Sequence, residues 1–115
     1  MYCVVYNPYT LHSVLVDVNI PGVSTPYYAE QVAHRLAKKY GAGYTYRCEV
    51  PIVGEGNEKA YAGFTKYMGR YMLSALSSDA SSLLQYLGAN AIVTPLEKIV
   101  INTLEDAIAL LNTLS

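Results

Sequence analysis

The sequence is poor in charge, contains no tryptophan and has no long uninterrupted apolar run. Charged residues make up 15% of the 115 residues, against roughly 25% in an average soluble domain. No run approaches the roughly 18 apolar residues of a membrane helix. The N-terminus has neither the basic start nor the apolar stretch of a signal peptide. We therefore expect no membrane association and a cytoplasmic location.

Cysteine is also scarce, because the chain has only Cys3 and Cys48. Two cysteines are too few for a disulfide scaffold, and we expect two reduced thiols buried in strands. A single bridge stays open if the strands that carry them are neighbours. A zinc site that adds His12 and His34 would lack the closely spaced ligand pairs of zinc sites. We therefore expect no metal and no cofactor.

Tyrosine is the residue that the chain has in excess. It contributes 12 residues to a composition that is 52% hydrophobic. Tyrosine is enriched where a surface must be apolar and still carry a polar group. Because homodimers are the commonest soluble assembly, we predict that the chain associates with itself.

The tyrosine-rich, tryptophan-free composition resembles that of small proteins of hyperthermophilic archaea and their viruses. The resemblance extends to composition only, and the residues match no family fingerprint. Proteins of thermophiles tend to be rich in lysine and glutamate, and this chain departs from that pattern.

Hydrophobic periodicity predicts one domain, 1–115, with the element order β-β-α-β-α-α-β-β-α. Alternation typical of strands marks 11–20 and 44–53, and 2–6, 91–94 and 98–101 are predicted to be short strands. Helical spacing marks 26–40, 58–76, 77–88 and 102–114. These elements predict an α/β (α+β) fold, a two-layer sandwich in which a mixed β-sheet carries its helices mainly on one face. The other face is expected to be open or paired with a second subunit.

The first half of the chain predicts a hairpin followed by a crossover. The strands 2–6 and 11–20 are joined by an Asn-Pro turn. The strand 11–20 points one apolar side toward the core, and the helix 26–40 then leads to 44–53, which suggests a parallel crossover. Pro51 cannot donate to a ladder, so 44–53 is expected at an edge or to end there.

The helix ends carry recognisable signals. Thr25 before Pro26 predicts a capped helix start, and Gly41 predicts the end of that helix. The last helix could be capped by Asn102 with Glu105 or by Thr103 with Asp106.

Gly54-Glu55-Gly56 lies between a predicted strand and a predicted helix, the context of a phosphate-binding loop. The third glycine of the dinucleotide fingerprint is replaced by Lys59, and no Gly-Lys-Ser/Thr follows. Acidic residues beside the glycines would repel a phosphate. The sequence therefore favours an ordinary turn over an anion cradle.

The predicted helix 58–76 carries a basic stripe. Helical spacing brings Lys59, Lys66 and Arg70 to one face, with Gly63 between them and Tyr67 beside them. Cations with an aromatic neighbour can hold a nucleic-acid backbone. A solvated face is the alternative, and it is favoured because three cations give only a modest electrostatic attraction. The candidate anion- or nucleic-acid-binding residues are Gly54, Gly56, Lys59, Lys66, Tyr67 and Arg70.

The polar side of the sheet offers weak catalytic candidates in Asp17 and Glu49. These residues could meet, together with Asn19 and Arg47, if the strands 11–20 and 44–53 are adjacent. No set of nucleophile, base and orienting group is visible in the sequence. His12 is expected to be a satisfied core histidine, and His34 a solvated one.

These observations favour a small homo-oligomeric interaction or regulatory protein over an enzyme. Its expected partner is a second copy of itself. A nucleic-acid- or nucleotide-binding protein that uses 54–70 is the first alternative. The net charge of −1 provides no overall attraction to nucleic acid, so only a local patch could serve it. A small nuclease-like or phosphate-transfer enzyme is the second alternative.

Overall fold

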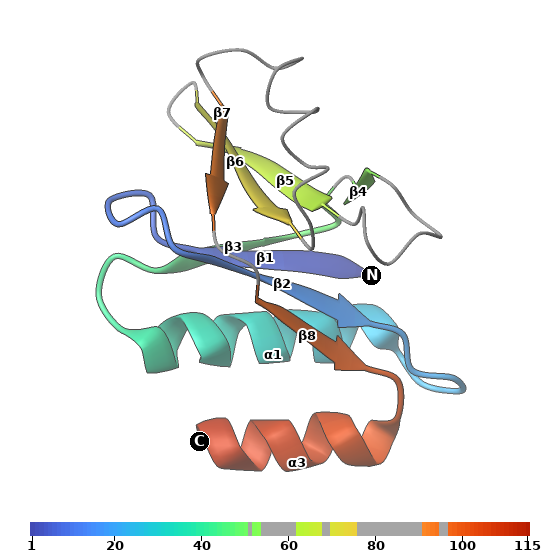
Figure 1. Ribbon diagram of the computed structural model, residues 1–115. Coiled ribbons are helices and arrows are strands. Elements are labelled where there is room, and N and C mark those ends of the chain that lie inside the picture. The colour runs from blue at the N-terminus through green and yellow to red at the C-terminus, as the bar shows by residue number, and fades with distance from the viewer. Residues whose placement is uncertain (51, 54–61, 68–69, 76–90, 95–96) are drawn as a thin grey trace.

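The computed structural model describes residues 1–50, 52–53, 62–67, 70–75, 91–94 and 97–115 (Figure 1). Within these ranges the chain has an α+β fold with two helices and a mixed four-stranded sheet. No helix of the described ranges is both long and apolar enough to cross a membrane.

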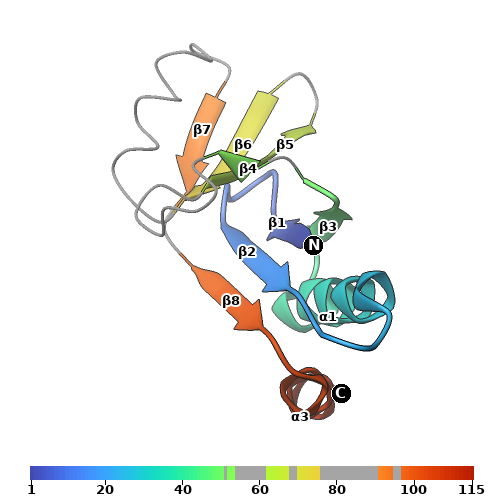
Figure 2. The same ribbon diagram turned by 90° about the vertical axis from the view of Figure 1, so that its right-hand side faces the viewer.

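The main sheet has the strand order β3-β1-β2-β8 (Figure 2). Its strands are β1 (Tyr2–Tyr6), β2 (Ser13–Val18), β3 (Thr45–Cys48) and β8 (Lys98–Ile101). β1 is antiparallel to β2 and to β3, and β8 is parallel to β2. The predicted hairpin of the first two strands is thereby confirmed. β2 and β3 run in the same direction, as a crossover requires, but β1 lies between them.

Both helices lie on one face of this sheet (Figure 1). The helix α1 (Thr25–Tyr40) directs five buried residues toward the strands. The helix α3 (Leu104–Leu114) packs beside α1 and β8. The apolar side predicted for β2 is confirmed, since it forms the core with α1. The core residues that β2 and the following loop contribute are Val14, Val16, Val18 and Ile20.

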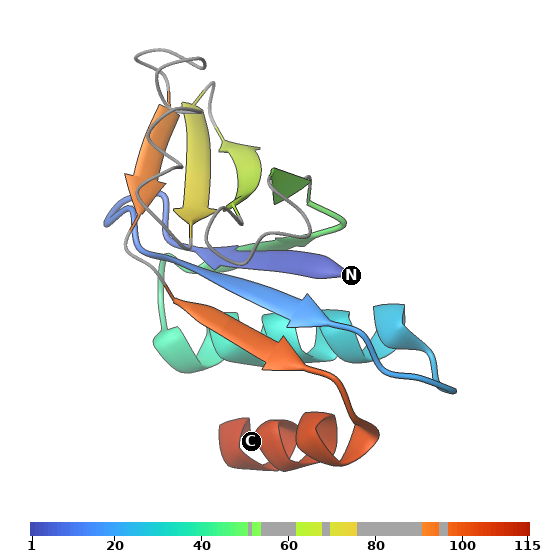
Figure 3. The same ribbon diagram turned by 45° about the vertical axis from the view of Figure 1, so that its right-hand side comes forward.

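The central part of the other face, on β1 and β2, is buried within the chain. Val4 is 0% exposed, and Tyr6 and Leu15 are each 1% exposed. A second sheet lies on that side, with β5 against β1 and β6 against β2 (Figure 3). An open face is therefore wrong for this region. The polar alternation of β2 was misleading because Ser13 is buried as well, at 0% exposure.

The second sheet has the order β4-β5-β6-β7. Its strands are β4 (Ile52–Val53), β5 (Ala62–Tyr67), β6 (Arg70–Ala75) and β7 (Ala91–Thr94). β4, β5 and β6 pair antiparallel in sequence order, and β7 is parallel to β6. The strands predicted at 91–94 and 98–101 are confirmed as β7 and β8, although they belong to different sheets.

The helix predicted at 58–76 is wrong over its described part, which forms the β5–β6 pair. The spacing of its basic residues is compatible with a helix, but Gly63 is a poor helix former. Phe64, Thr65 and Tyr67 favour strands, and pairing between neighbours decides such mixed cases. The helix predicted at 77–88 lies outside the described residues.

The strand predicted at 44–53 is interrupted. β3 ends at Cys48, and Glu49 has a positive φ of 59°, which directs the chain out of the ladder. The Val50 N–H still donates to the Tyr2 carbonyl at 3.2 Å, and the chain then continues into β4. The predicted edge position is confirmed, because β3 ends the strand order of the main sheet.

The helix ends differ in detail from their signals. Ser24 is the N-cap residue of α1, and the Thr25 hydroxyl is bonded instead to Ile20, whose N–H lies 3.2 Å away. Thr25 is therefore wrong as a cap. α1 ends before Gly41 as predicted. Of the two caps offered for the last helix, Thr103 is the one formed, since its Oγ1 accepts from the Asp106 N–H at 3.1 Å.

A disulfide joins Cys3 of β1 to Cys48 of β3. The two residues are direct partners in the antiparallel ladder, with their Cα atoms 4.0 Å apart. The expectation of two reduced thiols is therefore wrong. The alternative of a single bridge required that the strands carrying the two cysteines be neighbours, and they are. Disulfides are rare in the cytosol except in hyperthermophiles, so a cytoplasmic location stays a prediction.

Candidate functional site

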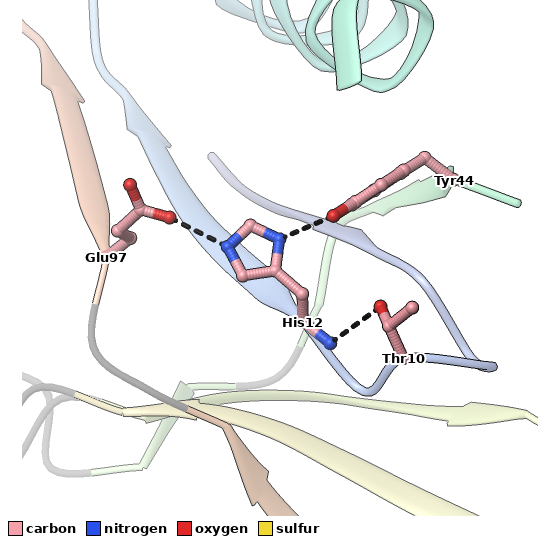
Figure 4. Close-up of polar contacts among 4 residues, drawn as sticks. All are labelled: Thr10, His12, Tyr44 and Glu97. Carbon is pink, nitrogen blue, oxygen red and sulfur yellow. Dashed lines mark hydrogen bonds and ion pairs between the residues drawn. The ribbon is translucent and has the colours of Figure 1, made fainter. Parts of the chain in front are cut away.

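Three polar side chains converge at one end of the main sheet, where three of its strands begin. β2, β3 and β8 run in the same direction, so the residues that precede them lie at the same end of the sheet. His12, Tyr44 and Glu97 each come directly before one of these strands. Figure 4 shows the imidazole of His12 between the phenol of Tyr44 and the carboxylate of Glu97.

Both nitrogens of His12 are engaged. Nδ1 lies 2.9 Å from the Tyr44 hydroxyl, and Nε2 lies 2.9 Å from Oε2 of Glu97. The backbone holds two of these residues in place, because the Glu97 carbonyl accepts from the Leu15 N–H at 3.0 Å and the Thr10 hydroxyl accepts from the His12 N–H at 3.5 Å. The site is open to solvent, since the side chains of His12 and Glu97 are 30% and 57% exposed.

Two aromatic rings also contact the imidazole of this histidine. Tyr40, at the end of α1, stacks on Tyr44 with ring centroids 4.9 Å apart and an interplanar angle of 29°. The His12 ring meets both tyrosines edge-on, at 5.4 and 5.7 Å. Burial, followed by the charge of Glu97 and by Tyr44, raises the pKa of Tyr40. Tyr40 is therefore a protonated, largely apolar wall of the site at neutral pH.

The arrangement satisfies His12 in either protonation state. In a neutral imidazole one nitrogen donates and the other accepts, so Nε2–H can donate to Glu97 while Nδ1 accepts from the Tyr44 hydroxyl. When protonated, the ring donates from both nitrogens. His12 was predicted to be a satisfied core histidine: both of its nitrogens have partners, but the core position is wrong, because the side chain is 30% exposed.

The cluster has a chemical and a mechanical consequence. A phenol, an imidazole and a carboxylate in series can exchange a proton between Tyr44 and His12. The same bonds tie the starts of three strands together and fix the Tyr44 ring. No spacing in the sequence relates residues 12, 44 and 97. The common signal is that each precedes a predicted strand or lies at its start.

A cavity of about 500 Å³ adjoins this end of the sheet, between α1 and the start of β3. Its lining comprises His34, Ala37, Lys38 and residues 41–46. A second hollow, of about 540 Å³, lies on the other side of the same helix positions and also includes His34 and Lys38. The predicted exposure of His34 is confirmed, and its ring lies edge-on to Tyr46 at 5.8 Å.

The catalytic candidates Asp17 and Glu49 are not brought together. Their strands are separated by β1, and the ladder partners of Asp17 are Tyr2 and Val100. Glu49 lies beyond the end of β3, where φ is positive. The adjacency on which this site depended is therefore wrong.

The candidate nucleic-acid residues fall partly outside the described ranges, which exclude Gly54, Gly56 and Lys59. Lys66 and Tyr67 lie on β5 and Arg70 on β6. Tyr67 pairs directly with Arg70 across the ladder, whereas Lys66 pairs with Tyr71. The single helical face that united the basic residues is therefore wrong, and their binding to nucleic acid stays a prediction.

Within the described ranges, no group of three or more His, Cys, Asp or Glu side chains could hold a metal ion. The sequence matches no protein-family model, no curated protein and no solved structure.

Proposed function

We propose that the chain is a small interaction protein that associates with itself through the edge strand β8. The observation that carries this proposal is the position of β8 at the end of the main sheet, with Val100 48% exposed (Figure 2). An apolar edge strand is a template for pairing with another chain. Ile108 of α3, which packs beside β8, is also 45% exposed.

The hydrogen bonds of the ladder show which backbone groups face outward. The carbonyls of Glu97 and Ile101 accept from residues in and after β2. In a parallel ladder the residues that bond to a given neighbour alternate along the strand. The N–H and C=O of Val100 therefore point away from β2.

A second copy fits this edge if a two-fold axis passes beside Val100. The two Val100 residues would then exchange both backbone hydrogen bonds, as a hydrogen-bonded antiparallel pair does. This register preserves the two faces of the sheet, since Ile99 of one copy lies opposite Ile101 of the other. It also keeps the two Lys98 residues apart and places the two α3 helices on the same face. The interface is isologous, the commonest kind in homodimers.

The test is the mass in solution, measured by light scattering during gel filtration. The wild type is expected at twice the 12.6 kDa of one chain. Val100→Lys is expected to be monomeric, because it places two like charges face to face at the axis. The matched control is Val23→Lys, which changes a 36% exposed valine in the loop before α1 and should stay dimeric. A wild type of single-chain mass at micromolar concentration would refute the proposal, as would a dimeric Val100→Lys variant.

A second candidate function, nucleic-acid binding, is favoured by the register of the β5–β6 pair. Tyr67 and Arg70 are direct ladder partners beside the connection between the strands, which places an aromatic and a cationic residue at neighbouring positions. Fluorescence anisotropy with single-stranded DNA, duplex DNA and RNA should show salt-dependent binding that is weaker in Tyr67→Ala/Arg70→Ala. Equal affinity in this double variant and the wild type would exclude the site.

A further inference from the structure

Two hollows meet at the same two residues of α1. His34 and Lys38 are four residues apart, so they lie on one face of the helix. The hollow toward β3 and the hollow toward the end of α3 are both lined by this pair.

The charged side chains that line the two hollows are basic. Lys38 lines both hollows, and Arg35 lines the hollow near α3. Arg35 is partly committed, because its Nη1 donates to the Leu111 carbonyl at 3.3 Å. Among the described residues that line the two hollows, none is an aspartate or a glutamate. A bound anion would therefore meet Lys38 without a competing acidic side chain in the lining.

Basic residues in the last turn of a helix have a simpler explanation, since they complement the helix dipole. Lys38 and Lys39 both satisfy that explanation. Only Lys38 lines the hollows, however, and Lys39 lines neither. Replacing Lys38 or Lys39 in turn therefore distinguishes a ligand site from a general effect of positive charge at the end of the helix.

Fixed aromatic rings form the opposite wall. Tyr44 is held by the bond to His12 and by stacking on Tyr40. The Tyr46 hydroxyl donates to Oε1 of Glu30 at 3.4 Å. Rings held in place before binding lose little conformational entropy when a planar ligand stacks on them. Stacking of a nucleobase on an aromatic side chain contributes about 1–3 kcal/mol per base.

From this combination we infer that the hollow between α1 and β3 binds a nucleoside monophosphate unit. The phosphate pairs with Lys38 and His34, and the base packs against the tyrosine wall. The volume of about 500 Å³ lies within the range of small-molecule sites, roughly 300–1,000 Å³. The same unit can come from a free nucleotide or from the phosphorylated end of a strand. This site is distinct from β8 and does not depend on self-association.

The experiment is a calorimetric titration of the protein with AMP, with inorganic phosphate and with a 5′-phosphorylated tetranucleotide. AMP is expected to bind saturably and more tightly than phosphate, because only AMP offers a base to the tyrosines. Lys38→Ala should weaken AMP binding by about tenfold or more, as expected for loss of a charge-assisted bond. The matched control Lys39→Ala should change it by less than about twofold, since an exposed charge outside the site acts only at long range.

Two further variants make the result specific. His12→Gln releases the Tyr44 hydroxyl from the imidazole and should weaken AMP more than phosphate. Val100→Lys should bind AMP as the wild type does, so failure of the dimer and failure of the site are distinguishable. Equal affinity for AMP and for the 5′-phosphorylated tetranucleotide indicates a free nucleotide as the ligand. Tighter binding of the tetranucleotide indicates the phosphorylated end of a strand. Absence of saturable AMP binding would overturn the inference, as would equal losses in Lys38→Ala and Lys39→Ala.

Discussion

The disulfide between β1 and β3 allows the most quantitative prediction. Cys3 and Cys48 are 45 residues apart in sequence, so the bond closes a long loop in the unfolded chain. The loop-closure model gives an entropy of about 13 cal/mol/K for this length, or about 4 kcal/mol at 25 °C. A domain of ordinary stability has about 5–15 kcal/mol in total. Breaking this bond should therefore remove a large share of the stability.

The perturbation is reduction of the wild type, with Cys3→Ala/Cys48→Ala as a permanent form. Urea unfolding should show a free energy of unfolding lower by about 4 kcal/mol, and the slope m should rise as the unfolded chain expands. In thermal unfolding this change corresponds to a fall in Tm of about 15 °C for a chain of this length. Alanine is used in place of serine because Cys3 is 0% exposed, and serine would bury a hydroxyl in the core.

Reduced wild type and the double alanine variant should agree to within about 1 kcal/mol. The residual difference reports the loss of two sulfur atoms from the core. Cys3→Ala alone should match the double variant closely, because it already prevents the cross-link. The reasoning would be refuted if reduction left the urea midpoint unchanged, or if thiol titration of the unreduced, denatured protein found two free thiols.

Two smaller predictions concern a helix cap and a phenol. Thr103→Ala should cost about 1 kcal/mol, measured by urea unfolding, because the N–H of Asp106 loses its acceptor; Thr113→Ala, within the same helix, is the comparison and should cost less. The pKa of Tyr40 is raised in the folded state, so the folded chain binds this proton more tightly than the unfolded chain. Stability should therefore fall as the pH rises from about 10 toward the folded pKa, and Tyr40→Phe should remove that part of the alkaline loss. An identical alkaline profile in the variant would contradict the assignment.

The elements with a single consistent signal were predictable from the sequence. β1, β2, α1 and α3 each combine a clear period with a turn or cap at the boundary, and the structure places them close to the expected residues. The strands around Pro95 were also predictable. In these segments the local preference and the packed environment favour the same conformation.

The β5–β6 pair was not predictable, because its local signals conflict. The basic spacing is compatible with a helix, whereas its glycine, aromatic and threonine residues favour strands. The decision depends on strands elsewhere in the chain, since β4 pairs with β5 and β7 pairs with β6. Residue spacing contains no information about such partners.

The polar cluster and the disulfide needed the strand order. The polar cluster forms only because three strands of common direction begin at the same end of the sheet, which brings together His12, Tyr44 and Glu97. Cys3 and Cys48 meet only because β3 pairs with β1 in one register. A shift of one residue would have turned the side chains to opposite faces. Asp17 and Glu49 fail as a site for the same reason, since β1 separates their strands.

The main sheet draws its strands from both ends of the chain, which determines the order in which it can be built during synthesis. β1, β2, α1 and β3 come from the first 48 residues and can pair as soon as they leave the ribosome. β2, however, has no partner on its outer side until residues 98–101 arrive. A nascent chain that has reached residue 94 therefore presents the edge of β2, beside Val16 and Val18, as a free template for other chains. β8 thus completes the sheet last, and translation arrested shortly before it would leave a product prone to aggregate.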